Sequence, residues 1–380
     1  MVAISVRFLK YMDNIPNHLS KIDGQLGKLT ILGFPFEELA INASFEEIIF
    51  LFLYSHLPTQ GELEQLTEKL LGHRDLEPKI LDVLKSVAEN QIEPTEALRI
   101  GVSCLSMDMR SHRMDKEGIN GALKIIASIP VITATYWRLI NDKTIIAPHP
   151  ELGHAANYLY MLTGQDSSPE HVRGLETYLN TVVEHGLNAS TFAARVVMST
   201  RSDFVSAITA AIGALKGILH GGAPGPVIEM LLEIKEPSEI EPYLRHKFES
   251  RERLMGFGHR IYRVKDPRAA LLSEVAEDIW HHKGSSKFWT LAVDVERIAL
   301  RLLKEYKPHR SIKTNVEYHT ALVLHGLDIP TPLFTSTFTI SRVVGWLAHC
   351  FEQLEHDRII RPKSIYTGPS EQKWFPITER

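Results

Sequence analysis

Two histidines beside glycine-rich segments are the residues best suited to acid–base chemistry. His220 ends a strongly patterned helical stretch and is followed at once by glycines and prolines, and His259 directly follows Gly256-Phe257-Gly258. Imidazole exchanges protons near neutral pH, so a histidine held at a helix terminus beside a flexible backbone can transfer a proton or polarise a carbonyl group. His220 also fits a simpler role, in which a solvated histidine favours the negative end of the helix dipole.

A basic segment surrounds the second histidine. Five arginine, lysine or histidine side chains lie within the ten residues 259–268, beside Gly256 and Gly258. Cationic side chains next to exposed backbone N–H groups form a surface that binds phosphates or carboxylates, although a solvated basic loop has the same composition. The glycines are not a dinucleotide-binding fingerprint, because no strand precedes them and their spacing is wrong.

Two further motifs place polar groups beside helix ends. Glu184-His185-Gly186 closes one predicted helix, and the segment 188–191 provides a cap for the next. Near the C-terminus, Arg342, Arg358 and Arg361 offer guanidinium forks, the geometry that binds carboxylates with two parallel hydrogen bonds. Ordinary helix capping and surface arginines are the alternative interpretation of these motifs.

The elements that must position these residues are helices. From Phe36 onward apolar residues recur at spacings of three and four, as Ile208 and Ile212 do. Alternating β patterns of any length are missing, and residues 22–27 indicate a turn between short extended pieces. Pro130 is expected to kink or split its helix. The pattern predicts an all-α protein of many medium-length helices. The predicted helices cover residues 45–52, 59–71, 78–87, 95–105, 118–139, 154–161, 168–185, 192–199, 202–220, 227–234, 239–254, 268–282, 289–306, 315–324 and 341–354.

Composition excludes several classes of protein. The 380 residues are 44% hydrophobic and 23% charged, which is typical of a soluble globular chain. A net charge of −4 gives no reason to expect a nucleic-acid partner. Two cysteines form neither a disulfide framework nor a zinc knuckle and favour a reducing compartment. No His-x-x-x-His pair with a third ligand is visible, which disfavours a metalloenzyme.

The N-terminal region and the apolar runs bear on location. Arg7 and Lys10 interrupt what would be the apolar core of a secretory signal. The longest apolar run, residues 48–54, is too short to span a bilayer. We therefore expect a cytoplasmic protein that does not bind membranes.

Taken together and in order, the motifs resemble those of the citrate synthase family, which includes 2-methylcitrate synthase, over nearly the whole chain. The segments that carry the resemblance are Glu184-His185-Gly186 with Asn188-Ala189-Ser190-Thr191-Phe192, residues 213–223 with Leu219-His220-Gly221-Gly222-Ala223, Gly256-Phe257-Gly258-His259-Arg260 with Asp266-Pro267-Arg268, Ile340-Ser341-Arg342 with Gly345-Trp346 and Ala348-His349, and Ile360-Arg361-Pro362.

This resemblance implies a multi-helical fold in two parts, a large domain of residues 1–221 and 329–380 and a small domain of residues 222–328 that closes over the active site. It implies the condensation of acetyl-CoA or propionyl-CoA with oxaloacetate and water, with no metal and no cofactor. The reaction needs a base for the carbon acid and a donor for the enolate oxygen.

The resemblance also implies residue roles. Glu317 takes the place of the base, His220 is the donor to the enolate oxygen, and His259 polarises the oxaloacetate ketone. The implied ligands of the substrate carboxylates are His185, Arg268, Arg342, Arg361 and Arg74. The implied coenzyme A contacts are Arg253, Leu254, Met255, Gly256, Phe257 and Arg263. In a homodimer, Arg361 is expected to enter the active site of the partner subunit.

The chain departs from the family pattern at three places. The family's base is an aspartate in an Asn-Val-Asp segment. This chain has Asn315-Val316-Glu317 there, so Glu317 stands in place of the aspartate. The additional methylene displaces the carboxylate oxygens by about 1 Å unless the backbone adjusts, and such a displacement costs on the order of 10²-fold in rate. Glu93-Pro94-Thr95 and Leu32-Gly33-Phe34 stand where the family has His-Pro-Met and Arg-Gly-Tyr. An alternative hypothesis is therefore a catalytically impaired paralogue that binds oxaloacetate or CoA in a regulatory role.

Overall fold

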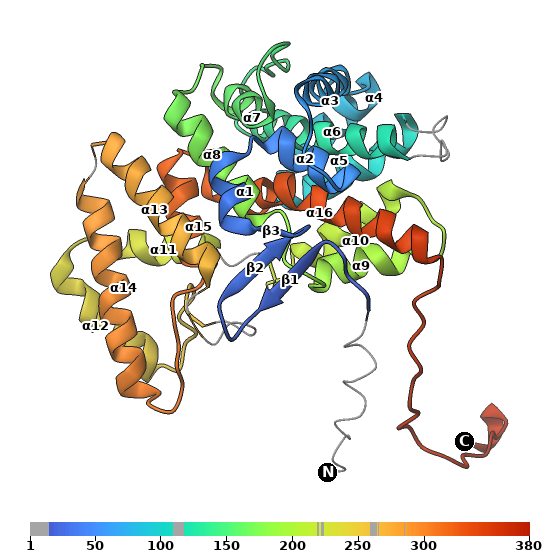
Figure 1. Ribbon diagram of the computed structural model, residues 1–380. Coiled ribbons are helices and arrows are strands. Elements are labelled where there is room, and N and C mark those ends of the chain that lie inside the picture. Colours follow the sequence, from blue (N-terminus) through green and yellow to red (C-terminus); the bar gives the residue numbers. More distant parts are fainter. Residues whose placement is uncertain are drawn as a thin grey trace.

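The computed structural model describes residues 15–108, 118–218, 220–221, 224–258, 264, 266–284 and 286–380. The predicted site residues His259 and Arg263 lie outside the described residues. Within the described part the chain is predominantly helical, which confirms the predicted all-α class (Figure 1). The helices are α1 Phe36–Asn42, α2 Phe45–Tyr54, α3 Gln60–Gly72, α4 Pro78–Glu89, α5 Pro94–Asp108, α6 Ile119–Ile140, α7 His154–Thr163, α8 Pro169–Val182, α9 Ala189–Met198, α10 Phe204–Leu215, α11 Pro224–Glu233, α12 Ile240–Glu249, α13 Pro267–His282, α14 Ser286–Tyr306, α15 Val316–Gly326 and α16 Phe334–His356.

The N-terminal region forms a small antiparallel sheet in the order β1-β2-β3, with strands Ser20–Asp23, Lys28–Ile31 and Phe34–Pro35. The Asp23 carboxylate closes the first turn by accepting hydrogen bonds from the backbone N–H groups of Gln25 and Leu26. This hairpin is the pair of short extended pieces that the sequence indicates.

Helix starts follow the capping signals of the sequence. Ser44 and Glu47 form a reciprocal capping box at the start of α2, and Asp203 caps α10 through its side chain. The end of α10 differs from the prediction, because the helix ends at Leu215 rather than at His220. The N–H of Gly221 instead bonds to the carbonyl oxygen of Leu215 at 2.8 Å, so the chain turns and His220 lies in that turn.

Pro130 does not split its helix, one of the two outcomes expected of it. Pro130 lies inside α6, which continues unbroken from Ile119 to Ile140. This helix packs against α3, α4, α5, α7 and α16, and that packing compensates for the hydrogen bond that proline removes. By length and composition alone α6 could cross a membrane, but 72% of its most apolar window is buried inside the protein, as expected of a core helix. Pro224 begins α11, a position where its missing N–H is not needed.

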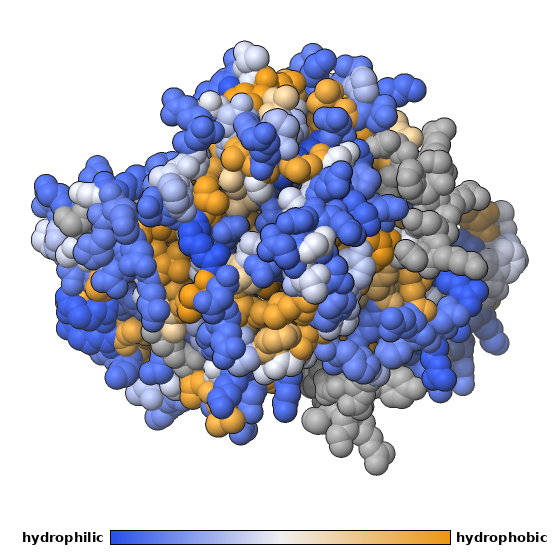
Figure 2. All heavy atoms as spheres, turned by 45° about the horizontal axis from the view of Figure 1, so that its top comes forward, coloured by the Kyte–Doolittle hydropathy of each residue, from blue (hydrophilic) through white to orange (hydrophobic). Residues whose placement is uncertain are grey.

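Helix α16 runs through the middle of the molecule (Figure 1). It packs against α9, α10, α6 and α8, and seventeen of its residues are buried. Helices α11 to α15 gather on one side, where α13 packs against both α15 and α8 (Figure 1). The face shown in Figure 2 is mostly hydrophilic, with hydrophobic side chains showing between the polar ones. The segment after α16 leaves the body of the protein as an extended C-terminal tail (Figure 1).

A glycine allows α16 to approach the segment that carries His185. A Cβ atom added to Gly345 would lie 2.4 Å from the carbonyl oxygen of Val183 and 2.9 Å from Oε2 of Glu184. No rotamer change relieves a clash with a backbone atom, so the two segments would have to separate.

Gly345→Ala is therefore expected to lower the free energy of unfolding by about 1–3 kcal/mol, the usual cost of overpacking a core. The matched control is Gly61→Ala on α3, where an added Cβ meets nothing within 4 Å, and it should change stability by about 1 kcal/mol or less. Urea unfolding of the variants at equal protein concentration measures both effects. Equal midpoints for Gly345→Ala and wild type would contradict the close approach.

Candidate active site

A cavity of about 480 Å³ lies where α9, α16 and the loops around His185 and His220 face α13, α15 and the segment 253–258. This volume is in the range of small-molecule binding sites. Its lining residues are His185, Leu187, Asn188, Ala189, Ile218, His220, Arg253, Leu254, Met255, Gly256, Phe257, Gly258, Arg268, Asn315, Val316, Glu317, Phe338 and Arg342. Most of the predicted site residues therefore converge on one cavity.

A defined hydrogen-bond network orients the imidazole of His220. The backbone N–H of Ser190 points to Nε2 of His220 at 3.3 Å, and Oγ of Ser190 lies 2.7 Å from the same nitrogen. Because a backbone N–H can only donate, Nε2 is the acceptor and the ring proton is assigned to Nδ1. Ser190 is itself held by the indole N–H of Trp346, which donates to its Oγ at 3.1 Å.

The imidazole of His220 is uncharged at neutral pH. Burial, together with the positive charge of Arg342, lowers the pKa of His220 to about 4. A neutral Nδ1–H group is a hydrogen-bond donor that carries no net charge, which suits the stabilisation of a developing oxyanion.

Glu317 occupies the first turn of α15. Asn315 caps this helix by accepting a hydrogen bond from the N–H of Glu317 at 3.1 Å, and its side-chain amide donates to the carbonyl oxygen of Gly258 at 3.0 Å. The N–H of Asn315 also bonds to the carbonyl oxygen of Gly256 at 3.0 Å. The start of α15 is thus tied to the glycine segment, and this fixes the position of the carboxylate.

The environment of Glu317 prepares it to act as a base. Burial raises the pKa of its carboxyl group to about 7, against the opposing effect of the nearby Arg268 and Arg342 guanidinium groups. A base with a pKa near the operating pH combines the correct protonation state with sufficient proton affinity. The side chain is half-buried, not exposed to solvent.

Two buried arginines line the same cavity. Asp266 caps α13 and holds Arg268 through two hydrogen bonds of 3.2 Å to Nε and 2.8 Å to Nη2. Nε of Arg342 donates to the carbonyl oxygen of Val182 at 2.8 Å, and its guanidinium lies 4.7 Å from the ring centre of Phe338. Burial lowers the pKa of Arg342 to about 10, which still leaves it charged at neutral pH. The cavity therefore offers two fixed positive charges to an anion.

The segment that carries His185 is anchored through Glu184, its neighbour in the sequence. The carboxylate of Glu184 is fully buried and accepts hydrogen bonds from the N–H of Gly186, from Oγ of Ser20 at 2.9 Å and from Nε2 of His349 at 3.1 Å. Burial acts to raise the pKa of Glu184, but the charges of His349 and Arg342 and the hydrogen bonds from His349 and Ser20 together outweigh burial, so the pKa of Glu184 is lowered. Burial acts to lower the pKa of His349, but Glu184 and Glu352 together raise it.

Two of the predicted substrate ligands, Arg74 and Arg361, do not line this cavity in the single chain. Arg74 is buried elsewhere, and its Nη1 donates to the carbonyl oxygens of His149 at 3.1 Å and Leu152 at 2.7 Å. Arg361 is exposed on the C-terminal tail. Among the predicted coenzyme A contacts, the segment 253–257 lines the cavity.

Sequence reasoning missed the residues that position the others. In the sequence Ser190 has the pattern of a helix cap, Asp266 has only the pattern of a residue before proline, and no local pattern connects His349 to Glu184. The one local signal was the Asp266-Pro267 pair, since an Asx residue before proline often starts a helix. The other contacts join residues far apart in the sequence, for example the 165 positions between Glu184 and His349.

The fold and the site together define a helical protein with a cavity lined by a carboxyl group of near-neutral pKa, an uncharged imidazole and two guanidinium groups. The model of the family described as citrate synthase, C-terminal domain, matches residues 12–363. The chain belongs to the citrate synthase family.

Named relatives cover most of the chain. It is 40% identical over 354 residues to citrate synthase 2 of Bacillus subtilis, covering 93% of each protein. It is 35% identical over 353 residues to 2-methylcitrate synthase of Shewanella oneidensis, covering 93% of this chain and 92% of that one.

Solved structures agree with the sequence relatives. The structure of a ternary complex of carboxymethyl coenzyme A and oxaloacetate with citrate synthase from the archaeon Thermoplasma acidophilum matches with a TM-score of 0.86 and 32% identity, over 97% of each chain. Citrate synthase from Pyrobaculum aerophilum matches with a TM-score of 0.86 and 34% identity, over 97% of this chain and 93% of that one. The family and the enzyme class inferred from the motifs are thus confirmed.

The raised pKa of Glu317 predicts a pH-dependent stability. Because its folded pKa of about 7 exceeds the ordinary value of 4.5, the folded state binds the proton more tightly, and the free energy of unfolding falls as pH rises between these values. Glu317→Gln removes this titration and should be more stable than wild type above neutral pH by on the order of 1–3 kcal/mol. Below the lower pKa the two proteins should be equally stable.

Urea unfolding of the ligand-free protein at acidic and alkaline pH checks this expectation, with the exposed Glu229→Gln on α11 as the control. A stability difference between wild type and Glu317→Gln that stays constant with pH, or that favours wild type at alkaline pH, would show that Glu317 is not held above its ordinary pKa.

Proposed function

We propose that this enzyme condenses an acyl-CoA, acetyl-CoA or propionyl-CoA, with oxaloacetate and water to give citrate or 2-methylcitrate and CoA. The observation that carries the proposal is the convergence of Glu317, His220, Arg268 and Arg342 on one cavity. The names of the relatives and the ligands of the archaeal ternary complex support it.

Each described side chain has a role in this reaction. Glu317 removes a proton from the carbon next to the thioester, and Nδ1–H of His220 donates to the thioester oxygen, where negative charge develops. The carbon then attacks the ketone of oxaloacetate, whose oxygen takes up a proton, and water cleaves the thioester to release CoA. His259 is assigned to the ketone by the family pattern.

The oxaloacetate carboxylates are assigned to Arg268, Arg342 and His185. Guanidinium groups already held by Asp266 and by the carbonyl oxygen of Val182 need little reordering when a carboxylate binds. Arg74 is left out of the proposal, because the structure gives its Nη1 two carbonyl acceptors outside the cavity.

Coenzyme A is assigned to the segment 253–257 together with Arg263. We propose that a small domain, residues 222–328, closes on a large domain, residues 1–221 and 329–380, and excludes water from the reaction. We also propose that the enzyme is cytoplasmic, and the two free cysteines, Cys104 and Cys350, are consistent with a reducing compartment. The proposed reaction uses no metal and no cofactor.

The choice between the two acyl groups is left to experiment. One additional methyl group in a pocket changes the transition-state energy by only about 1–3 kcal/mol, so any of several apolar lining residues could decide it. Leu187, Val316 and Phe338 line the cavity beside the reacting groups. A comparison of kcat/KM for both acyl-CoAs settles this choice.

A thiol reagent that detects released CoA tests the proposal. With oxaloacetate and either acyl-CoA, the wild-type enzyme should release CoA, and no release above the blank at high enzyme concentration would refute the proposal. Glu317→Asp should lose activity, by up to about 10²-fold, because the backbone is fitted to the longer side chain. A large gain with Glu317→Asp would instead favour the impaired paralogue.

The family pattern also assigns Arg361 to the partner's active site in a homodimer, and complementation tests this assignment. Glu317→Gln and Arg361→Ala are each expected to be inactive as homodimers. In a mixed dimer one of the two sites combines an intact Glu317 with an intact Arg361 from the partner, so co-expression should restore about a quarter of wild-type activity. No restoration, with mixed dimers demonstrated by two different affinity tags, would place Arg361 in its own subunit's site or outside catalysis.

A further inference from the structure

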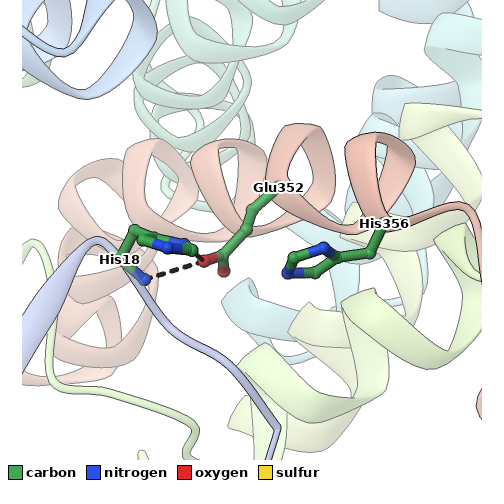
Figure 3. Close-up of side chains that lie close together, drawn as sticks. All are labelled: His18, Glu352 and His356. Carbon is green, nitrogen blue, oxygen red and sulfur yellow. Dashed lines mark hydrogen bonds and ion pairs between the residues drawn. The ribbon is translucent and has the colours of Figure 1, made fainter.

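His18, Glu352 and His356 form a cluster at the surface, away from the cavity. The ligand atoms of these three residues all lie within 4.8 Å of one another. Glu352 and His356 are one turn apart on α16, and His18 comes from the segment that leads into β1. In Figure 3 the carboxylate of Glu352 lies between the two imidazoles.

From this geometry we propose that the cluster binds one divalent transition-metal ion, of which Zn²⁺ is the representative case. Two imidazoles and one carboxylate are the ligand set that Zn²⁺ accepts, and three protein ligands leave further positions to water. Mg²⁺ and Ca²⁺ prefer all-oxygen ligands and are not expected to bind here.

The carboxylate is held in place before any ion arrives. Oε1 of Glu352 accepts hydrogen bonds from the backbone N–H of His18 at 2.7 Å and from its Nδ1 at 3.0 Å. Oε2 faces the other way and pairs with Nη1 of the buried Arg195 at 2.6 Å, with Nδ1 of His349 at 3.5 Å. The ion would therefore bind Oε1, while Arg195 and His349 orient the carboxylate from behind. Such outer contacts commonly change metal affinity by about 10–100-fold.

The imidazoles are accessible to an incoming ion. The side chain of His18 is 77% exposed, and His356 is exposed as the last residue of α16. Their ring centres are 6.3 Å apart, so small side-chain rotations bring a nitrogen of each ring toward one point. The partial negative charge at the C-terminus of α16 also favours a cation at this position.

Metal binding here would join two distant parts of the chain. His18 and Glu352 are 334 positions apart, and the C-terminal tail that carries Arg361 begins directly after His356. A bound ion would therefore stabilise the entry of β1 and the base of this tail at the same time. The inference stands on this cluster and does not depend on the proposed reaction.

Calorimetric titration of the full-length protein, without an affinity tag and free of chelator, with Zn²⁺ tests the site. We expect one ion per chain, with affinity at least about 10-fold weaker in His18→Gln and in His356→Gln. His56→Gln is the matched control, because its exposed imidazole lies 3.5 Å from Glu62 without a second histidine, and it should bind Zn²⁺ as wild type does. Mg²⁺ should give no comparable signal.

A second readout guards against variants that merely misfold. Zn²⁺ should raise the thermal midpoint of wild type and of His56→Gln but not that of His18→Gln or His356→Gln, whose midpoints without metal should equal that of wild type. Identical Zn²⁺ affinity in wild type, His18→Gln and His356→Gln, or no binding to wild type, would overturn the proposal. Assaying CoA release from the same samples keeps this outcome separate from that of the proposed reaction.

Discussion

The site depends on the balance of two opposing effects at Glu317. Removing a carboxylate from water favours its protonated form, while Arg268 and Arg342 favour its charged form. If the arginines prevailed, the carboxylate would be too weak a base for a carbon acid. Burial prevails here, and the resulting pKa of about 7 lets the group accept a proton at neutral pH and release it again.

The residues that line the cavity also lower the pKa of the His220 imidazole. Burial and Arg342 together lower the pKa of His220. The same guanidinium also acts to lower the pKa of Glu317. This effect suits a neutral hydrogen-bond donor but weakens a base. It keeps His220 neutral, which the role of a donor requires, and it limits the rise in the pKa of Glu317. One cavity with guanidinium groups in its lining thus shifts the pKa values of the proposed base and the proposed donor in opposite directions, the usual means by which environment assigns acid–base roles.

Helix α16 provides the framework for this balance. Arg342 reaches the cavity from it, Gly345 permits its close approach to Val183, and Trp346 holds the serine that orients His220. One turn further along, His349 pairs with Glu184 and so supports the loop that carries His185. From the other side, Asn315 and Asp266 fix the starts of α15 and α13. The proposed metal cluster lies at the far end of this same helix.

The sequence predicted the helices well, because periodic apolar residues and capping pairs such as Ser44 and Glu47 act locally. The family motifs, and not local periodicity, pointed to the residues that the structure brings together at the cavity. It was wrong about the end of α10, where a turn at Gly221 separates His220 from the helix. It failed where contacts join distant segments, as in the serine beside His220 and the carbonyl oxygens that bind Arg74. A family motif identifies which residues react, but only the packed structure shows what holds them.

The most direct test of this account follows the proton that Glu317 is proposed to remove. With a four-carbon dicarboxylate that lacks the ketone in place of oxaloacetate, the methyl protons of acetyl-CoA should exchange with deuterium from the solvent, and NMR measures that rate. We predict exchange in wild type that rises as pH passes through the pKa of Glu317, about 7, and falls by on the order of 10² or more in Glu317→Gln. Exchange at the wild-type rate in Glu317→Gln would contradict the account.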